Sequence, residues 1–563
     1  MRQVVLILAG LVLLVGAGLW LNNAALSPKV VAQRPAVGSQ IDWDSVQDDE
    51  SRRLEISWLG LPRYPNGQEG GYIERLIEDT FNVELKPVLM DAIAYERKKP
   101  LKFASGNIPD VTWEADPIDL QRDVYHGFII PVPFAVIKRY APHFTKLSLA
   151  NAPIGWLYAH CNGRNYGIPT IYLGGAYPAP GVWRKDWLDR IGMAHRPETL
   201  EQFHEALQRF TFDDPDGDGR SNTYGMSGNV NAAYGFFPEF FGAFGVTPFN
   251  WIMRDGRAVY GGILPETKQA LEMLRQWYDE GIIDPEFITD GTNNCQRLRN
   301  KFANGHLGYR SAGFRSGATF IDTFDPTNSR STVTVMNKLD PNAELAASAY
   351  PRGSNGSSGI KIWGTGGNIL AFGRQVEQHP EKVIRVLKIL DRISMDEKLY
   401  MQASRGRHGV HWDYRVPDTG EPGTGPSSGI RYLPPYDDVN VYKQEVLGSF
   451  FGGGGLDPDI EDKYTWVKEI QFRSRYRDPA FGVTDLFGKV DIMPSAKRYF
   501  ADLSNWQQTI FAEIIRGDRD LDYFETFREE WHRRGGSVLT EEANELRQVK
   551  NQIYDMMGVV VDR

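Results

Sequence analysis

The sequence predicts an α/β protein built as two lobes, and three observations support this prediction. The chain has 563 residues, which is enough for two sizeable cores. Hydrophobic residues make up 41% of it and charged residues 24%, the balance of an ordinary globular protein. Segments with strand and helix patterns alternate, and no period of 20–50 residues recurs, which disfavours a solenoid or a propeller.

Residues 1–32 predict export. Arg2 precedes an apolar run over residues 4–21, the pattern of a secretory signal peptide. A run of ~18 residues could also remain as an uncleaved membrane anchor, but small residues favour cleavage after Ala32. No cysteine lies near this run, which excludes a lipid anchor. We expect a protein of the periplasm or of the extracellular face of the cytoplasmic membrane, and we interpret the polar residues 33–50 as a linker.

Local patterns then predict the folded elements in order. Alternation over residues 54–59 predicts a first strand, apolar spacing over residues 71–81 a helix, and residues 83–85 a second strand, together a βαβ unit on a parallel sheet. A helix ends at Gly106, and residues 109–113 start another strand. Further helices are predicted over residues 200–210, with Thr199 and Gln202 as a capping box, and over 267–280, 380–390, 495–515, 521–533 and 540–557.

Composition narrows the classes of function. Lys and Arg number 63 against 72 Asp and Glu, and without a basic block such a chain is a poor nucleic-acid binder. Aromatic residues make up 12%, including 14 Trp and 25 Tyr, which suits planar and partly polar ligands such as sugars. Cys161 and Cys295 are the two cysteines. An exported chain permits a disulfide between them, but we favour two separate buried thiols.

An Asp-rich loop that begins at Asp214 is the sharpest local motif. Oxygen side chains at loop positions 1, 3, 5 and 9, a carbonyl at position 7 and a glycine at position 6 match the start of an EF-hand calcium loop. Position 12, where a bidentate Glu is expected, is Gly225, so a nearby donor such as Thr223 has to complete the shell. The alternative is an Asp/Gly turn without metal.

Catalytic motifs are few. The chain has no Gly-x-Ser-x-Gly elbow, Walker loop, His-Glu-x-x-His or CxxC motif. The glycines at residues 364–367 resemble only half of a dinucleotide fingerprint, and His408 and His411 lack a third zinc ligand nearby. Paired carboxylates of a glycosidase stay open, because they can lie far apart in sequence. The pattern favours a protein that is not an enzyme.

Several aromatic residues are candidate ligand platforms. Most tryptophans are core residues, but several here flank predicted strand ends or Gly-rich loops, where ligands of open α/β sheets bind. Trp113, Trp363 and Trp412 fit that placement best. The candidate ligand-binding residues are Trp412, Trp363, Trp113, Tyr172, Trp183, Trp251, Trp58, Tyr414 and His411.

Six segments occur in an order that resembles a known family. They are Leu-Lys-Phe-Ala-Ser-Gly-Asn-Ile-Pro-Asp-Val at residues 101–111, Trp-Arg-Lys-Asp-Trp-Leu-Asp-Arg-Ile-Gly at 183–192, and shorter stretches at 197–203, 302–308, 367–373 and 409–412. Together with the Asp-rich loop they resemble the extracellular solute-binding proteins, family 1, of ABC importers, in the large oligosaccharide-binding branch that includes alginate receptors. The resemblance covers nearly everything from about residue 50 to about residue 550.

The resemblance implies a two-lobed, periplasmic-binding-protein-like fold of type II, with a hinge between the lobes and a helical C-terminal region. The chain is expected to cross between lobes near Pro169 and Pro351, so that Cys161 and Cys295 lie in different lobes as free thiols. The implied divisions are lobe 1 at residues 51–169 and 351–400, lobe 2 at 170–350, and hinge-proximal loops and C-terminal helices at 401–563.

It also implies the two sites. Trp412 matches a family position whose indole stacks on sugar rings, and Arg184 with Lys185 could serve an acidic sugar or form a charge pair. A structural Ca²⁺ would be held by Asp214, Asp216, Asp218, the Arg220 carbonyl, Asn222 and Thr223.

The expected function is that of a non-catalytic receptor, which captures an oligosaccharide outside the cytoplasmic membrane and presents it to ABC permease subunits. Its contact with the membrane would be through the N-terminal segment or the permease alone. Two alternatives stay open, an exported glycan-degrading lyase or hydrolase and the ligand-binding subunit of a membrane sensor.

Overall fold

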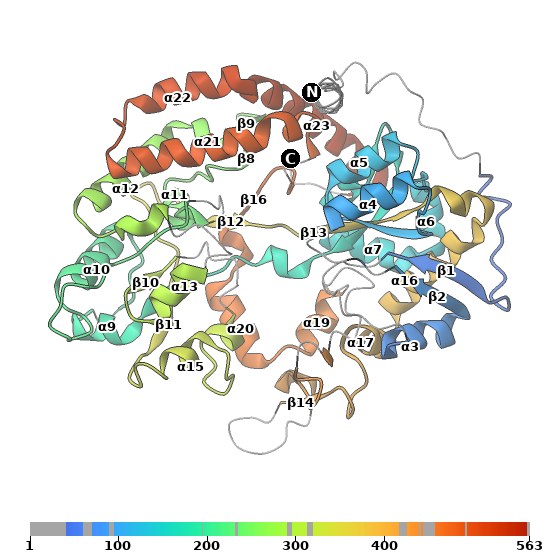
Figure 1. The fold of residues 1–563 in the computed structure, drawn as a ribbon, viewed down its shortest axis with the longest axis horizontal. Helices are drawn as coiled ribbons and strands as arrows, with labels where there is room; N and C mark the ends of the chain where they lie inside the picture. The colour runs from blue at the N-terminus through green and yellow to red at the C-terminus, as the bar shows by residue number, and fades with distance from the viewer. Residues whose placement is uncertain are drawn as a thin grey trace, which may run out of the picture.

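The computed structural model describes residues 41–59, 70–88, 90, 95–193, 195–230, 235–289, 296–311, 319–415, 425–438, 441–442, 457–489 and 492–559. The described elements form two α/β lobes that lie side by side, with a layer of C-terminal helices along one edge of both (Figure 1). None of the helices within these residues combines the length and the hydropathy of a membrane span.

A five-stranded sheet is the centre of the first lobe. β1 (Leu54–Trp58) pairs in parallel with β2 (Val83–Pro87) and β3 (Val111–Glu114). β13 (Gly366–Phe372) is antiparallel to β3 and to β6 (Gly167–Ile171), which gives the order β2–β1–β3–β13–β6. Because α3 (Tyr72–Phe81) connects β1 to β2, the predicted βαβ unit is confirmed.

Helices cover this sheet, and residues distant in sequence meet on it. The central one is α16 (Glu381–Met395), which packs against α3 and confirms the helix predicted at residues 380–390. The other helices of this lobe are α4 (Tyr95–Ala104), α5 (Pro117–Tyr125), α6 (Phe134–Tyr140), α7 (Pro142–Asn151), α8 (Ile154–Tyr158) and α17 (Glu397–Arg405).

The second lobe is built on a three-stranded antiparallel sheet. β7 (Val182–Arg184) lies between β10 (Tyr309–Arg310) and β11 (Leu345–Ala347). The helices packed around it are α9 (Lys185–Arg190), α10 (Leu200–Phe212), α11 (Pro238–Gly242), α12 (Pro265–Asp279), α13 (Gln296–Ala303), α14 (Phe320–Thr323) and α15 (Thr332–Met336). The capping box before α10 is present with both of its hydrogen bonds, from Thr199 and from Gln202, as the sequence predicts.

Three C-terminal helices confirm the last predicted segments, and they connect the lobes. α21 (Ala496–Arg516) packs on α12 of the second lobe. α22 (Tyr523–Trp531) is followed by a short kinked turn and then by α23 (Ser537–Met557). α23 contacts α8 of the first lobe and also β9 (Arg257–Tyr260), the second strand of a hairpin begun by β8 (Trp251–Arg254).

Segments between the two sheets form the connection at the centre of the molecule. After β6 the chain forms η1 (Leu173–Ala176), and it returns through β12 (Ile360–Ile362), which pairs in parallel with β16 (Gly482–Thr484). The outgoing and returning segments are joined by hydrogen bonds from Gly364 N to Gly175 O (3.0 Å) and from Tyr172 N to Thr365 O (2.8 Å). Pro169, where the first crossing is predicted, still pairs with Ile369 inside the first sheet, so the crossing begins after β6.

The start of the described chain corrects one prediction. Residues 41–50, assigned from their polarity to a linker, are packed on the first lobe, and we call residues 41–53 the N-terminal strap. Trp43 is buried, and the Asp48 carboxylate, which is fully buried, accepts hydrogen bonds from the Arg385 guanidinium of α16 at 2.8 and 3.0 Å. Lys388 also contacts Asp48, at 3.1 Å. The acidic run is therefore paired with α16. The rest of the predicted linker and residues 1–32 lie outside the described residues.

Candidate functional site

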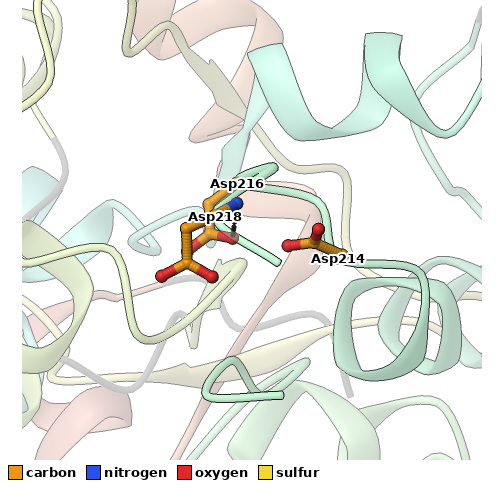
Figure 2. A group of neighbouring side chains, drawn as sticks. All are labelled: Asp214, Asp216 and Asp218. Atoms are coloured by element: carbon orange, nitrogen blue, oxygen red, sulfur yellow. Dashed lines mark hydrogen bonds between the residues drawn. The ribbon is translucent and has the colours of Figure 1, made fainter. Parts of the chain in front are cut away.

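The Asp-rich loop follows α10 and forms a tight turn. Figure 2 shows Asp214, Asp216 and Asp218 on this turn, and their carboxylate oxygens lie within 4.8 Å of one another. Backbone amides contact all three, since Gly219 N donates to Asp214 Oδ2 (3.0 Å), Asp218 N donates to Asp216 Oδ1 (3.4 Å) and Arg220 N donates to Asp218 Oδ1 (2.8 Å). Within the described part of the chain this is the one group of three metal-ligating side chains.

The charges and acceptors of this loop fit a hard cation. Asp214 Oδ1 and Asn222 Oδ1 are buried acceptors without a hydrogen-bond donor. Burial, the neighbouring Asp214 carboxyl and the charge of Asp218 raise the pKa of Asp216. Oxygen donors of this kind, gathered on a turn, are those that Ca²⁺ prefers.

One proposed ligand has a second partner. Thr223 is buried and its hydroxyl donates to the Phe210 carbonyl (2.9 Å), so its proton is directed to the end of α10. Gly225 has no room for a side chain, because a Cβ there would lie 2.6 Å from the Leu207 carbonyl oxygen. The donors that remain for a cation are the three aspartates, the Arg220 carbonyl and Asn222.

A second candidate site is a pocket of about 300 Å³ between elements of the two lobes, which we call the interlobe pocket. One wall is formed by residues of α14 and of α20 (Val467–Tyr476), two helices that pack against each other. On the other are α17, α19 (Pro458–Lys463) and the hairpin of β14 (Trp412–Tyr414) and β15 (Ile430–Tyr432). The hairpin sits on the first lobe, where His411 packs against Tyr72 of α3 at 4.7 Å.

Aromatic side chains form part of the lining of the interlobe pocket. They are Tyr432, Tyr464 and Trp466. Arg415, just after β14, lies over the Trp466 ring at 4.5 Å and forms an ion pair at 2.6 Å with Asp325, a buried residue that follows α14. This ion pair joins an element on the first lobe to one on the second.

Of the predicted aromatic residues, four are buried in the cores. Trp183 packs against Phe203 and Tyr309 (4.3 Å), and Trp251 against Tyr260 (5.4 Å). Trp58 and Trp113 lie on strands of the first sheet with 2% and 7% of their surface exposed. In this conformation core side chains cover the indole faces that were predicted as ligand platforms.

Trp412, Tyr414 and His411 occupy the hairpin beside the interlobe pocket. Trp412 is buried, donates from Nε1 to Gly406 O (2.8 Å), and meets the pocket-lining Tyr464 edge-on at 6.0 Å. Tyr414 packs on Trp412 at 5.6 Å. His411 is buried and accepts at Nδ1 from the Arg407 amide (2.8 Å). Trp412 thus supports the pocket wall from behind.

Tyr172 and Trp363 are the two predicted residues with large exposed faces. They are 43% and 46% exposed, and both lie on the segments that connect the lobes. Tyr177, on the same segment as Tyr172, packs against the guanidinium of Arg473 at 5.3 Å, and Arg473 lines the interlobe pocket. The exposed face of Tyr172 therefore belongs to a segment that contacts the pocket lining, whereas Trp363 lies on the returning segment.

Two charged residues predicted as possible sugar contacts are engaged elsewhere. Arg184 is buried and pairs with Asp186 (2.5 Å) and Asp340 (2.7 Å). Lys185 pairs with Asp189 and Glu344 on the surface. Of the cysteines, Cys161 is a free, half-buried thiol whose pKa is raised by burial to about 11, and Cys295 lies outside the described residues.

A buried charge cluster ends β3. Lys99 of α4 contacts Glu114 and, at 2.8 Å, Asp123 of α5, and all three side chains are at most 2% exposed. Burial raises the pKa of Glu114 to about 7, because the attraction of Lys99 does not offset desolvation and the repulsion from Asp123. Asp119 adds repulsion from the same helix.

This cluster predicts a pH-dependent stability. The folded state holds the Glu114 proton more tightly than the unfolded chain, where a Glu titrates near 4.3, so the contribution of Glu114 to stability is greatest below that pH and is lost as the pH rises toward and through 7. We expect the variant Glu114→Gln to lose this pH-dependent decrease in the unfolding free energy, which is of the order of a few kcal/mol. Lys99 stays compensated in the variant, because its ion pair with Asp123 is unchanged. Urea unfolding between pH 4 and 8 measures it, with Glu55→Gln on the exposed face of β1 as control. Parallel profiles of wild type and Glu114→Gln would contradict the prediction.

Sequence reasoning missed most of the interlobe pocket. Arg415, Tyr464, Trp466 and Arg473 belong to segments that carry no motif and lie far from residues 319–322 in the chain. The one available signal was the density of aromatic and basic residues over 464–477, which is not specific.

Comparisons with known proteins bear on these sites. No family model matches the chain. The polygalacturonan/rhamnogalacturonan-binding protein YtcQ of Bacillus subtilis is 24% identical over 364 residues, which are 64% of this chain and 67% of that protein. The fructooligosaccharide ABC transporter substrate-binding protein FusA of Streptococcus pneumoniae is 27% identical over 215 residues, 36% of this chain and 39% of that protein. The stretch shared with FusA is thus well under two thirds of that relative's length.

Solved structures share the fold along almost the whole chain. The alginate-binding protein AlgQ2, in a structure without calcium ion, has a TM-score of 0.60 at 17% identity and covers 88% of this chain and 98% of its own. An extracellular solute-binding protein from Bifidobacterium longum subsp. infantis has a TM-score of 0.64 at 14% identity, with 90% and 100% covered. A FusA EF-hand mutant with fructo-nystose has a TM-score of 0.58 at 17% identity, with 90% and 100% covered. The predicted resemblance and the two-lobed, periplasmic-binding-protein-like fold are confirmed.

Proposed function

We propose that the chain is an exported solute-binding receptor, which captures an oligosaccharide between its lobes and delivers it to the permease of an ABC importer. The observation that carries the proposal is the interlobe pocket, whose walls come from both lobes and include Tyr432, Tyr464 and Trp466. A ligand held by both walls is bound fully only when the lobes are closed, so its binding energy shifts the hinge equilibrium. The relatives named above as binding proteins for oligosaccharides or polysaccharides support it.

The chemistry of the pocket favours binding over catalysis. The described carboxylates of its lining are engaged: Glu461 pairs with Arg405 at 2.7 Å, Glu469 accepts from the Phe320 amide at 2.7 Å, and Asp322 accepts from the Thr319 hydroxyl at 2.9 Å. A glycosidase needs two carboxyl groups that face the glycosidic bond, whereas these three already face protein donors.

Titration calorimetry with a panel of oligosaccharides, joined to X-ray scattering of the free and saturated protein, tests the proposal. We expect binding of at least one oligosaccharide, a smaller radius of gyration on binding, and recovery of the labelled sugar intact after prolonged incubation. Cleavage of the sugar would establish the glycan-degrading alternative. Absence of binding across the panel would overturn the proposal.

We further propose that the Asp-rich loop binds Ca²⁺ as a structural ion. The acidic turn and the two buried acceptors that lack a hydrogen-bond donor support it. The similar structures of AlgQ2 without calcium ion and of a FusA EF-hand mutant support it as well. The three aspartates, the Arg220 carbonyl and Asn222 would hold the ion, which would neutralise the repulsion among the carboxylates.

Calcium is predicted to stabilise the second lobe. At 100 times the dissociation constant, Ca²⁺ should raise the unfolding free energy by about 2.7 kcal/mol, which a thermal shift detects. We expect EDTA to lower the melting temperature and Asp216→Asn to abolish the difference. Asp213→Asn, which removes a neighbouring exposed carboxylate paired with Arg209, is the matched control. An identical melting temperature with Ca²⁺ and with EDTA would refute the site.

A further inference from the structure

The charges that line the interlobe pocket specify the class of ligand, an inference that rests on the proposed function. Six of the described lining residues are charged at neutral pH. Three are arginines and three are acids, so their formal charges cancel: Arg405, Arg415, Arg473, Asp322, Glu461 and Glu469.

Each of these arginines already has a carboxylate partner. Arg405 pairs with Glu461 at 2.7 Å, and Arg415 pairs with Asp325, behind the wall, at 2.6 Å. Arg473 lies 3.3 Å from both Glu469 and Asp462. The described wall therefore offers no cation whose charge is left uncompensated.

A ligand carboxylate would be disfavoured in this pocket. The carboxylate of the ligand could approach a guanidinium of the wall only close to the protein carboxylate that is already paired with it, for example Glu461, which is paired with Arg405. Two like charges this close repel, and the repulsion is stronger at a protein surface than in water because the effective dielectric constant is lower there. The ligand would also lose its hydration without gaining an unpaired cation.

Hydroxyl groups suit the same wall. A hydroxyl both donates and accepts, so it can donate to a carboxylate oxygen and accept from a guanidinium N–H that the ion pair leaves over. Arg415 has five N–H groups, and only one of them is given to Asp325. Tyr432, Tyr464 and Trp466 add apolar surface for the C–H faces of a sugar ring.

We propose that the ligand of the interlobe pocket is an uncharged oligosaccharide, and that oligosaccharides of uronic acids are excluded by the paired charges of the wall. This separates the chain from the relatives whose names specify polygalacturonan or alginate, and places its ligand with uncharged sugars such as the fructooligosaccharides named for FusA.

The experiment compares oligosaccharides that match in length and linkage and differ in the charge at C6. Calorimetry with galacturonan oligomers and their carboxyl-reduced counterparts, and with mannuronan oligomers and their carboxyl-reduced counterparts, provides the matched pairs, and fructooligosaccharides are added as a further uncharged class. We expect binding to uncharged members only, with an affinity that changes less than twofold between 50 and 500 mM salt. Tight binding of a uronate that weakens steeply with salt would overturn this inference and leave the proposed function intact. Binding of no member would overturn the proposed function itself.

A variant makes the charge argument testable on its own. Glu461→Gln removes the partner of Arg405 but keeps an acceptor for the Tyr400 hydroxyl, which donates to Glu461 Oε1 at 2.5 Å. We expect this variant to bind uronate oligomers at least tenfold more tightly than wild type does. Asp459→Asn, an exposed residue of α19 outside the pocket, is the charge-matched control and should not change uronate binding. Equal uronate affinities of Glu461→Gln and Asp459→Asn would refute the role given to the ion pairs.

Discussion

Replacing Asp48 with Ala should lower the unfolding free energy of the first lobe by about 3–5 kcal/mol, the usual cost of leaving a buried charge without its partner. The Arg385 side chain is 1% exposed, and Asp48 is its carboxylate partner in the strap. Backbone carbonyls of Phe81 and Asp49 would still accept from the guanidinium, at 2.8 and 2.7 Å, but they carry no net charge. Urea unfolding followed by hydrogen exchange in α16 measures the loss.

Two further variants decide whether the effect comes from the buried pair. Asp44→Ala removes a strap carboxylate whose pair with Arg139 is exposed, and it should cost at most about 1 kcal/mol. The double variant Asp48→Ala with Arg385→Met should recover much of the lost stability, because no uncompensated charge stays buried. Equal costs of Asp48→Ala and Asp44→Ala would show that the strap contributes little.

Replacing Arg415 with Ala should weaken oligosaccharide binding by about 30-fold or more, which corresponds to about 2 kcal/mol. The variant leaves the Asp325 carboxylate, 1% exposed, without its cation at the contact between the lobes. It also removes the guanidinium from the Trp466 face, which lines the pocket. Both losses penalise the closed state more than the open one, so the hinge equilibrium shifts against capture.

Calorimetry and scattering together test this second effect. The affinity should fall, and the radius of gyration of the unliganded variant should be larger than that of wild type. Lys185→Ala, which removes an exposed ion pair of the second lobe, is the matched control and should change neither quantity. An unchanged affinity in Arg415→Ala would mean that the pair with Asp325 serves stability alone.

Local patterns were sufficient for most of the elements. The capping box of Thr199 and Gln202 predicted the start of α10 to the residue, because its hydrogen bonds join residues three apart. The βαβ unit and the three C-terminal helices were also predicted, the helices to within three residues at each end, since apolar spacing over ten or more residues reports directly on which face is buried.

Contacts between distant residues could not be predicted in this way. The acidic residues of the strap have the composition of a solvated linker. Arg385, the cation that pairs with the buried Asp48, lies 337 residues later in the chain. Trp183 and Trp251 lie next to strand ends, and nothing in the local sequence predicts that Tyr309 and Tyr260 pack against them. The interlobe pocket is lined by residues of α14, α17 and α20, which are far apart in the chain. The balance of charges in its lining therefore cannot be read from the sequence.

The contacts of α23 bear on how quickly a captured sugar escapes. This helix touches α8 of one lobe and β9 of the other, and a kink at Gly535 (φ 123°) joins it to the preceding helices. Opening of the two lobes would therefore either break the contact of α23 with one of these two elements or change the backbone conformation at Gly535. If the chain is the receptor proposed above, the dwell time of its ligand would depend partly on these remote contacts of α23, so weakening them should hasten escape even though no atom near the ligand has changed.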